Sequence, residues 1–223
     1  MRATFSPLAR EQLGHRLFQR LIRGAPEGLV LQRYSGLKSW PMSRVKGLAF
    51  RSVLRAHTLL RGEQALDGLY SHLEPSIAHT MRAPLAATWY PLSLYVALWD
   101  AIQRTTGGDQ DYPRLVGRLC AEHDLKLVHK VLFATLNSNV ALKVTARMFG
   151  SYYDTGTCSA NRIDDRSFRF LFEGCVGFSE PMWMELHGSL EVFVDLSTNA
   201  KSQSQLVQGG QIGASSRIVD IRW

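Results

Sequence analysis

The spacing of apolar residues changes from helical to strand-like within residues 140–176. Between 140 and 148, apolar side chains recur every four positions, which predicts one buried face of a helix. Further on, Phe168, Phe170 and Phe172 alternate with other residues, as in a strand that is buried on one face. An Asp-Thr-Gly sequence lies between the two patterns, and these residue types end helices and form turns. The pattern therefore predicts a helix that leads into a two-stranded hairpin.

Helical spacing also dominates the chain before this hairpin. It predicts six or seven helices from residue 43 onward and no strand among them, with one more amphipathic helix ahead of them. Proline and glycine residues separate these segments. The predicted helices cover residues 7–23, 43–60, 63–73, 75–87, 89–104, 112–122, 124–136 and 139–153.

The pattern after the hairpin predicts one more helix and two more strands. Residues 179–181, Ser-Glu-Pro, have the order of an N-cap, an early acidic residue and a first-turn proline, and apolar residues follow at helical spacing as far as Phe193. Alternation then predicts strands at 201–208 and 215–223. The predicted fold class is α+β, a helical bundle followed by strand, strand, helix, strand and strand.

The size of the chain suits one core with an appendage. It has 223 residues, of which 45% are hydrophobic. We interpret residues 1–42 as a basic N-terminal helical extension and 43–223 as a single α+β domain, with a helical half at 43–153 and a sheet half at 154–223.

Positive charge is concentrated in the N-terminal quarter. The formal net charge is +7, but residues 1–55 alone hold eleven lysines and arginines against Glu11 and Glu27, a net charge of +9. The remaining residues therefore carry a net charge of about −2. One face of the first predicted helix could meet phosphates or anionic lipid, although a solvated outer face has the same pattern. This basic patch consists of Arg10, Arg16, Arg20 and Arg23.

Cysteine usage and hydropathy indicate a soluble cytoplasmic protein. Cys120, Cys158 and Cys175 are odd in number and form no C-x-x-C pair, so neither a disulfide framework nor a thiolate zinc site is expected. No signal peptide is apparent, because arginines interrupt the first 25 residues. The longest apolar stretch, around 89–99, contains a proline and is too short to span a bilayer.

The predicted helix 89–104 carries a wide aromatic face. Leu92, Tyr95, Trp99 and Ile102 follow a three-four-three spacing. Such a face packs in a core, or it lines a site for a flat or lipid-like molecule, since both uses need the same residues.

No catalytic constellation stands out. The Asp-Thr-Gly sequence at 154–156 is the aspartic-protease tripeptide, but those enzymes need two carboxylates in an all-β setting, and here it follows a predicted helix. The chain has no nucleophile elbow and no glycine-rich phosphate loop. Its histidines lack metal-ligand spacing, and Cys120 near His123 shows no sign of an activated thiolate. We therefore predict a protein that is not an enzyme and has no metal site.

Three stretches in this order resemble a paralogous family of uncharacterised cytoplasmic proteins that is expanded in myxobacteria. They are Val-Lys-Gly-Leu-Ala-Phe-Arg at 45–51, Trp-Tyr-Pro-Leu with a further tyrosine at 89–95, and Phe-Gly-Ser-Tyr-Tyr-Asp-Thr-Gly at 149–156. That family is similar to the haem nitric-oxide/oxygen-binding domains, the vinyl-reductase-type small-molecule-binding domains and the Bet3-like trafficking subunits. The resemblance covers 45–223 and implies a helical bundle leading into a four-stranded antiparallel sheet, used for ligand sensing or dimeric scaffolding.

The resemblance leaves the cofactor open. The haem branch holds the propionates with a Tyr-x-Ser-x-Arg clamp, and no tyrosine in this chain begins that pattern. An imidazole ligand for haem iron would have to come from His72, His79, His123 or His129. The vinyl-reductase-type domains often carry cysteines near their last strands, whereas residues 176–223 contain none.

We therefore predict a non-catalytic cytoplasmic regulatory or sensor domain that binds a small apolar ligand or a protein partner, as a homodimer. The alternative is a protein that binds nucleic acid or an anionic membrane through its basic N-terminal helix. The predicted ligand-lining residues are Trp89, Tyr95, Trp99, Met148, Tyr152, Phe170, Met182 and Leu186.

Overall fold

The computed structural model describes residues 43–125, 138–211 and 213–223, and these belong to one compact unit. The predicted helix at 7–23 with its basic patch lies outside the described residues, as does nearly all of the helix predicted at 124–136. The division of the chain into a basic extension and a single domain therefore stays a prediction.

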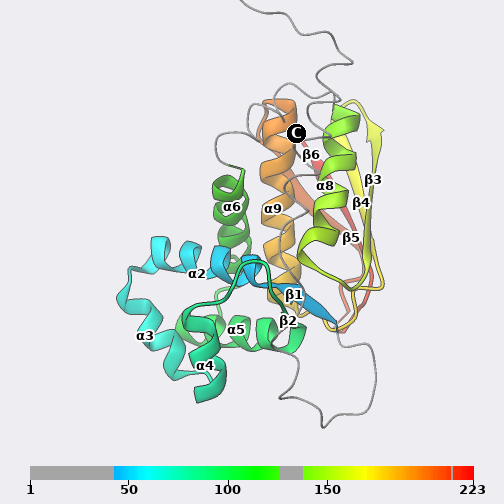
Figure 1. Ribbon diagram of the computed structural model, residues 1–223. Coiled ribbons are helices and arrows are strands. Elements are labelled where there is room, and N and C mark those ends of the chain that lie inside the picture. The colour runs from blue at the N-terminus through cyan, green and yellow to red at the C-terminus, as the bar shows by residue number, and fades with distance from the viewer. Residues whose placement is uncertain (1–42, 126–137, 212) are drawn as a thin grey trace, which may run out of the picture. The chain divides into compact units, whose positions relative to one another are not determined.

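The described part contains seven helices and two antiparallel sheets, which confirms an α+β fold (Figure 1). Its first half is built from β1 (Arg44–Lys46), α2 (Gly47–Arg61), α3 (Gln64–Ser71), α4 (Pro75–Arg82), β2 (Trp89–Pro91), α5 (Leu92–Thr105), α6 (Tyr112–Asp124) and α8 (Ser138–Tyr152). Its second half is built from β3 (Thr157–Asp164), β4 (Ser167–Glu173), α9 (Glu180–Thr198), β5 (Gln203–Gln208) and β6 (Arg217–Arg222).

The helical half contains two short strands, so the prediction that no strand occurs there was wrong. β1 pairs antiparallel with β2, with Val45 opposite Tyr90. Pro91 favours an extended conformation at the residue before it, and three-residue strands are too short to produce a visible alternation. As a result α2 begins at Gly47 and α5 begins at Leu92, each a few residues later than predicted.

β1 also connects the helical half to the end of α8. Val45 forms an isolated antiparallel bridge with Tyr153, and the Arg44 side chain forms an ion pair with Asp154. The Leu92 amide at the start of α5 donates a hydrogen bond of 2.8 Å to the Ser43 carbonyl. The Asp-Thr-Gly sequence therefore ends α8, and Asp154 attaches this end of the helix to β1.

The four-stranded sheet has the order β3-β4-β6-β5, with every neighbouring pair antiparallel. The alternating phenylalanines of β4 supply its buried face, because Phe168, Phe170 and Phe172 are at most 1% exposed. They lie beside Val219 and Ile221 of β6, which are fully buried. The predicted strand-strand-helix-strand-strand order is confirmed.

Helices cover the sheet in layers (Figure 1). α8 and α9 run along the sheet, and α6 packs on α9. The contact between α6 and α9 depends on two glycines: a Cβ at Gly117 would lie 2.0 Å from the Glu185 carbonyl oxygen, and a Cβ at Gly188 would lie 1.9 Å from that of Arg114. Only glycine permits backbones to approach so closely.

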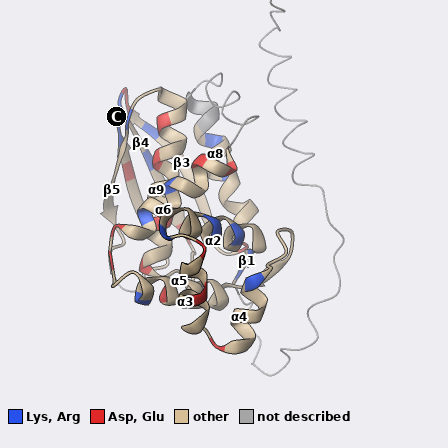
Figure 2. Cartoon of the chain, turned by 90° about the vertical axis from the view of Figure 1, so that its left-hand side faces the viewer, with Lys and Arg blue, Asp and Glu red and all other residues tan. Residues whose placement is uncertain are grey.

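Charged residues of both signs are interspersed over the described helices (Figure 2). Buried charge is paired between α6 and α9, where Arg114 and Arg118 both bind Glu191. Each helix of the described part is too short or too polar to span a bilayer.

Candidate ligand-binding cavity

A cavity lies where α2, α6, α8 and α9 meet β3 and β4. Its volume, counted as the space open to the centre of a water-sized sphere, is about 80 Å³. Most of its wall is apolar, with two carboxyl groups among the exceptions. The lining residues are Ala49, Ser52, Cys120, Ala121, Asp124, Thr145, Met148, Phe149, Tyr152, Tyr153, Cys158, Phe172, Glu185, Leu186, Ser189, Leu190 and Phe193.

Most of the lining residues lie on α8 and α9, where they recur at helical spacing. On α8 they recur at 145, 148, 149 and 152, and on α9 at 185, 186, 189, 190 and 193. Spacings of three and four residues put each run on one face of its helix. The two helices therefore present one face each to the same space, and the α6 residues close a further side of it.

Glu185 of α9 is the most deeply buried carboxyl group on the cavity wall. The Tyr95 hydroxyl, on α5, lies 2.8 and 2.9 Å from its two oxygens, and Trp99 Nε1 donates to Oε2 at 3.3 Å. Burial raises the pKa of Glu185 to about 8, although the hydrogen bonds from Tyr95 and Trp99 act in the opposite direction. The carboxyl group therefore changes its protonation near neutral pH.

Asp124, at the end of α6, is the second carboxyl group of the wall. The Ser52 hydroxyl of α2 donates to its Oδ2 at 2.7 Å, and the Tyr152 hydroxyl of α8 donates to the same atom at 3.3 Å. Burial raises the pKa of Tyr152, so this phenol stays protonated and remains a donor. Asp124 thus joins three helices at one edge of the cavity.

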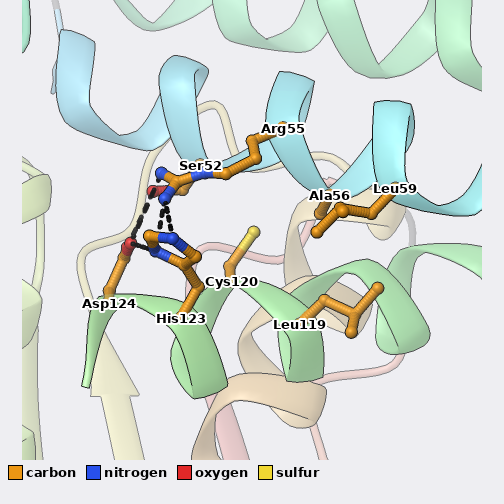
Figure 3. A pocket seen from close by; sticks show the side chains of 8 residues that line it. All are labelled: Ser52, Arg55, Ala56, Leu59, Leu119, Cys120, His123 and Asp124. Carbon is orange, nitrogen blue, oxygen red and sulfur yellow. Dashed lines mark hydrogen bonds and ion pairs between the residues drawn. The ribbon is translucent and has the colours of Figure 1, made fainter. Parts of the chain in front are cut away.

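A groove between α2 and α6 adjoins the cavity and shares Ser52, Cys120 and Asp124 with it (Figure 3). The Arg55 guanidinium bridges the groove, since Nη1 donates to His123 Nε2 at 2.6 Å and Nη2 lies 3.8 Å from Asp124 Oδ1. Burial raises the pKa of the Cys120 thiol well above its usual range. The groove itself has no room for a water-sized sphere.

The structure brings three of the predicted ligand-lining residues to the cavity wall: Met148, Tyr152 and Leu186. Tyr95 and Trp99 lie one layer behind it as the donors to Glu185. The other three lie elsewhere. Phe170 and Met182 are fully buried in the core, and the ring of Trp89, on β2, lies under the ammonium group of Lys46, on β1.

Sequence reasoning missed both carboxyl groups. The signal for Glu185 was present, because it interrupts the apolar face of α9 three residues after Met182 and one before Leu186. A charged residue within a buried helical stripe indicates a polar site in the core. Asp124 gives no such signal, since an aspartate at the end of a helix has the pattern of an ordinary turn residue.

The described candidates for a haem ligand do not line the cavity. His72 and His79 are exposed on the far helices, and His123 pairs with Arg55 in the groove. His129 lies outside the described residues.

Comparison with known proteins identifies the architecture. A scan against family models and a search of curated proteins find no match. Among solved structures, an Fe(II) unliganded H-NOX protein from K. algicida superposes with a TM-score of 0.56 at 15% identity, covering 79% of this chain and 95% of that one. The fold is similar to that of H-NOX domains. An oxygen-binding H-NOX domain related to soluble guanylate cyclases gives a TM-score of 0.56 at 14% identity, over 79% of this chain and 94% of its own.

The H-NOX likeness covers nearly all of those domains and about four fifths of this chain. It confirms the fold implied by the sequence resemblance, a helical bundle leading into a four-stranded antiparallel sheet. At this level of identity an H-NOX-like fold carries no chemistry by itself. The resemblance to the myxobacterial paralogues stays a prediction.

Proposed function

We propose that this protein is a non-catalytic sensor or regulatory domain that binds a small, mostly apolar ligand in the cavity between α8 and α9. The observation that carries the proposal is the cavity itself, a space in the core with an apolar wall and a few polar groups, which is the usual form of a small-molecule site. The similarity to ligand-binding H-NOX domains supports it.

The size of the space indicates a small ligand. One water needs roughly 10–15 Å³ of such space, so the cavity of about 80 Å³ has room for roughly six waters. Six waters occupy roughly 180 Å³ in the liquid, comparable with a cavity of ~150 Å³ that binds benzene. We therefore expect a ligand of about the size of a single six-membered ring.

The residues present do not fit haem, the group bound by H-NOX proteins. Haem iron requires an axial imidazole, thiolate, thioether or phenolate. Among the described lining residues none is a histidine, and the Met148 thioether serves haem iron together with a histidine. Burial raises the pKa of Cys158 to about 12 and also raises the pKa values of Cys120, Tyr152 and Tyr153, so these groups stay thiols and phenols. The described wall also offers no lysine or arginine for propionates, and the space is too small for a porphyrin.

The chemistry of the wall favours binding over turnover. Thiols with raised pKa values are poor nucleophiles, because the thiolate is the reactive form. Asp124 already accepts two hydrogen bonds from protein hydroxyls. These groups are suited to orient a ligand.

A cavity-filling variant tests the proposal. Leu186→Phe places a ring into the space, whereas Leu115→Phe makes the same change on an exposed part of α6 away from the cavity. Native mass spectrometry and calorimetry with ring-sized apolar compounds should show binding to the wild-type protein and to Leu115→Phe, but not to Leu186→Phe. Equal binding by the two variants, or none by the wild-type protein, would refute the cavity as the binding site.

The homodimer and the cytoplasmic location remain part of this proposal. They rest on the family resemblance and on the cysteine usage of the sequence. Sedimentation at several protein concentrations tests the dimer, and a monomer at the highest concentration would contradict it.

We propose a second function for the N-terminal quarter, binding of an anionic polymer or membrane surface. The supporting observation is the net charge of +9 in residues 1–55 against about −2 in the remainder. Phosphate groups attract such a segment without any defined pocket.

A further inference from the structure

Building on the proposed function, we infer that the cavity ligand is a small amine: a protonated nitrogen on an apolar body, with the nitrogen placed at the Glu185 carboxylate.

The partners of Glu185 are neutral, and this distinguishes it from the other buried acidic residues. In the described part of the chain, two more acidic residues are buried, Glu191 and Asp220. Glu191 is paired with arginines of α6, and Asp220 accepts two hydrogen bonds from Arg169 at 2.7 and 2.9 Å. Glu185 instead accepts hydrogen bonds from a phenol and an indole, and no described lysine, arginine or histidine pairs with it.

The arrangement around Glu185 is suited to a charged carboxylate that lacks its counterion. Tyr95 and Trp99 approach as donors, and donors stabilise the ionised form. A buried carboxylate without a cation is costly, so in the empty cavity it is neutralised by a proton, in agreement with a pKa raised by burial. An ammonium group would supply the missing positive charge together with up to three N–H donors.

The remaining groups near Glu185 favour a cation over an anion. Asp124 adds a second carboxyl group to the same wall, and the Cys120 thiol and the Tyr153 hydroxyl are neutral. The described wall has no cationic side chain. Arg55 compensates Asp124 from the adjoining groove, but Glu185 has no such partner, so an anionic ligand would meet an unpaired carboxyl group and electrostatics select against it.

Apolar side chains on the helix faces would hold the body of the amine. Met148, Leu190 and Phe193 occupy the wall along α8 and α9. A body with the size of one ring fits the volume and buries its apolar surface against these residues. Specificity then comes from the head group, whereas the apolar contacts supply affinity without discrimination.

Three ring compounds that differ in their head group test the inference on the full-length protein. Benzylamine is a cation at pH 7, benzyl alcohol is neutral and benzoate is an anion. Calorimetry should show that benzylamine binds about tenfold or more tightly than benzyl alcohol, since charge-assisted hydrogen bonds exceed neutral ones. Benzoate should not bind.

Glu185→Gln keeps the shape and removes the charge, and should weaken benzylamine binding by about tenfold or more while changing benzyl alcohol binding by less than about threefold. Glu122→Gln makes the same change at an exposed position of α6 that does not line the cavity, and should leave both affinities unchanged. Circular dichroism checks the fold of each variant.

Each outcome decides the matter. If benzyl alcohol or benzoate binds the wild-type protein as tightly as benzylamine, the amine inference fails and the proposed cavity function stands. If none of the three binds, both fail. If Glu185→Gln is folded and keeps full affinity for benzylamine, Glu185 is not the site of the ammonium group. If that variant does not fold, the three affinities of the wild-type protein still decide between the ligand classes.

Discussion

Gly117 of α6 lies directly against the backbone of Glu185 on α9, and a Cβ at Gly117 would come within 2.0 Å of the Glu185 carbonyl oxygen. The position of the cavity carboxyl group is therefore set by how closely two helices approach. A second contact of the same kind, between Gly188 and Arg114, lies one turn away along α9.

This contact predicts a large effect of Gly117→Ala. The methyl group meets backbone atoms that cannot rotate away, so α6 and α9 must separate, at a cost of about 3 kcal/mol in the free energy of unfolding. Gly150→Ala is the matched control, because a Cβ there has nothing within 4 Å on exposed α8 surface. It should gain up to about 1 kcal/mol from helix propensity. Urea unfolding measures both, and similar values for the two variants would contradict the close contact.

The raised pKa of Glu185 predicts that the free energy of unfolding falls as the pH rises. Its pKa is raised to about 8 by burial, against an ordinary value of 4.5, so between these values the folded protein holds a proton that the unfolded chain has lost. Stability therefore decreases with pH across this window, by about 1–2 kcal/mol between pH 6.5 and 8 for the ligand-free protein.

The buried histidines define where this effect should be measured. Burial lowers the pKa of His187 to about 4 and also lowers that of His57, so both add stability as the pH rises towards their ordinary value of 6.5. Unfolded histidines are still half protonated at pH 6.5, so their contribution becomes constant only about one unit higher, and Glu185→Gln shares it. Urea unfolding from pH 6.5 to 8 should show a decline in the wild-type protein that is absent from Glu185→Gln, and parallel profiles would show that Glu185 titrates normally.

Glu191 predicts a contrast between buried and exposed ion pairs. Its side chain is 2% exposed and receives hydrogen bonds from Arg118 at 2.9 Å and from the Ser204 amide at 2.8 Å. Glu191→Ala leaves Arg114 and Arg118 without this partner and should cost about 3–5 kcal/mol. Asp165→Ala removes the exposed pair with Arg162 and should leave the melting temperature nearly unchanged. Thermal unfolding tests this, and a small loss in Glu191→Ala would indicate that water replaces the carboxylate.

The second proposed function predicts salt-dependent binding by the N-terminal basic patch. Replacing Arg10, Arg16, Arg20 and Arg23 by Gln should weaken retention on DNA or anionic vesicles and reduce its salt dependence. The control variant carries the same loss of charge at exposed positions among the described residues. These positions are Arg104, Lys143, Arg147 and Arg166. Equal losses in the two variants would show that only total charge matters.

The sequence predicts the sheet half better than the helical half. The alternating phenylalanines of β4 are a strong signal because every second residue enters the core. β1 and β2 are too short to leave a pattern, and they form because residues far apart in the chain, such as Val45 and Tyr90, pair with each other. Such non-local pairing is outside the reach of local periodicity.

The candidate site was only partly predictable. The aromatic face with Tyr95 and Trp99 was visible, but its task is to donate hydrogen bonds to Glu185. The cavity depends on the spacing between helices far apart in the chain, and that spacing is set by glycines whose role appears only when both helices are in place. The local sequence therefore reveals which face of each helix is buried, but not the cavity between the helices.

The bridge from β1 to the end of α8 connects the cavity wall, through β1, to the start of α5. α8 carries one face of the wall, its last residues are fastened to Arg44 and Val45, and the preceding Ser43 holds the first amide of α5. α5 in turn carries Tyr95 and Trp99, which donate hydrogen bonds to Glu185. One short strand therefore links α8 to the helix that carries the hydrogen-bond donors of Glu185, so under the proposed function a ligand that displaces α8 would also act on these donors.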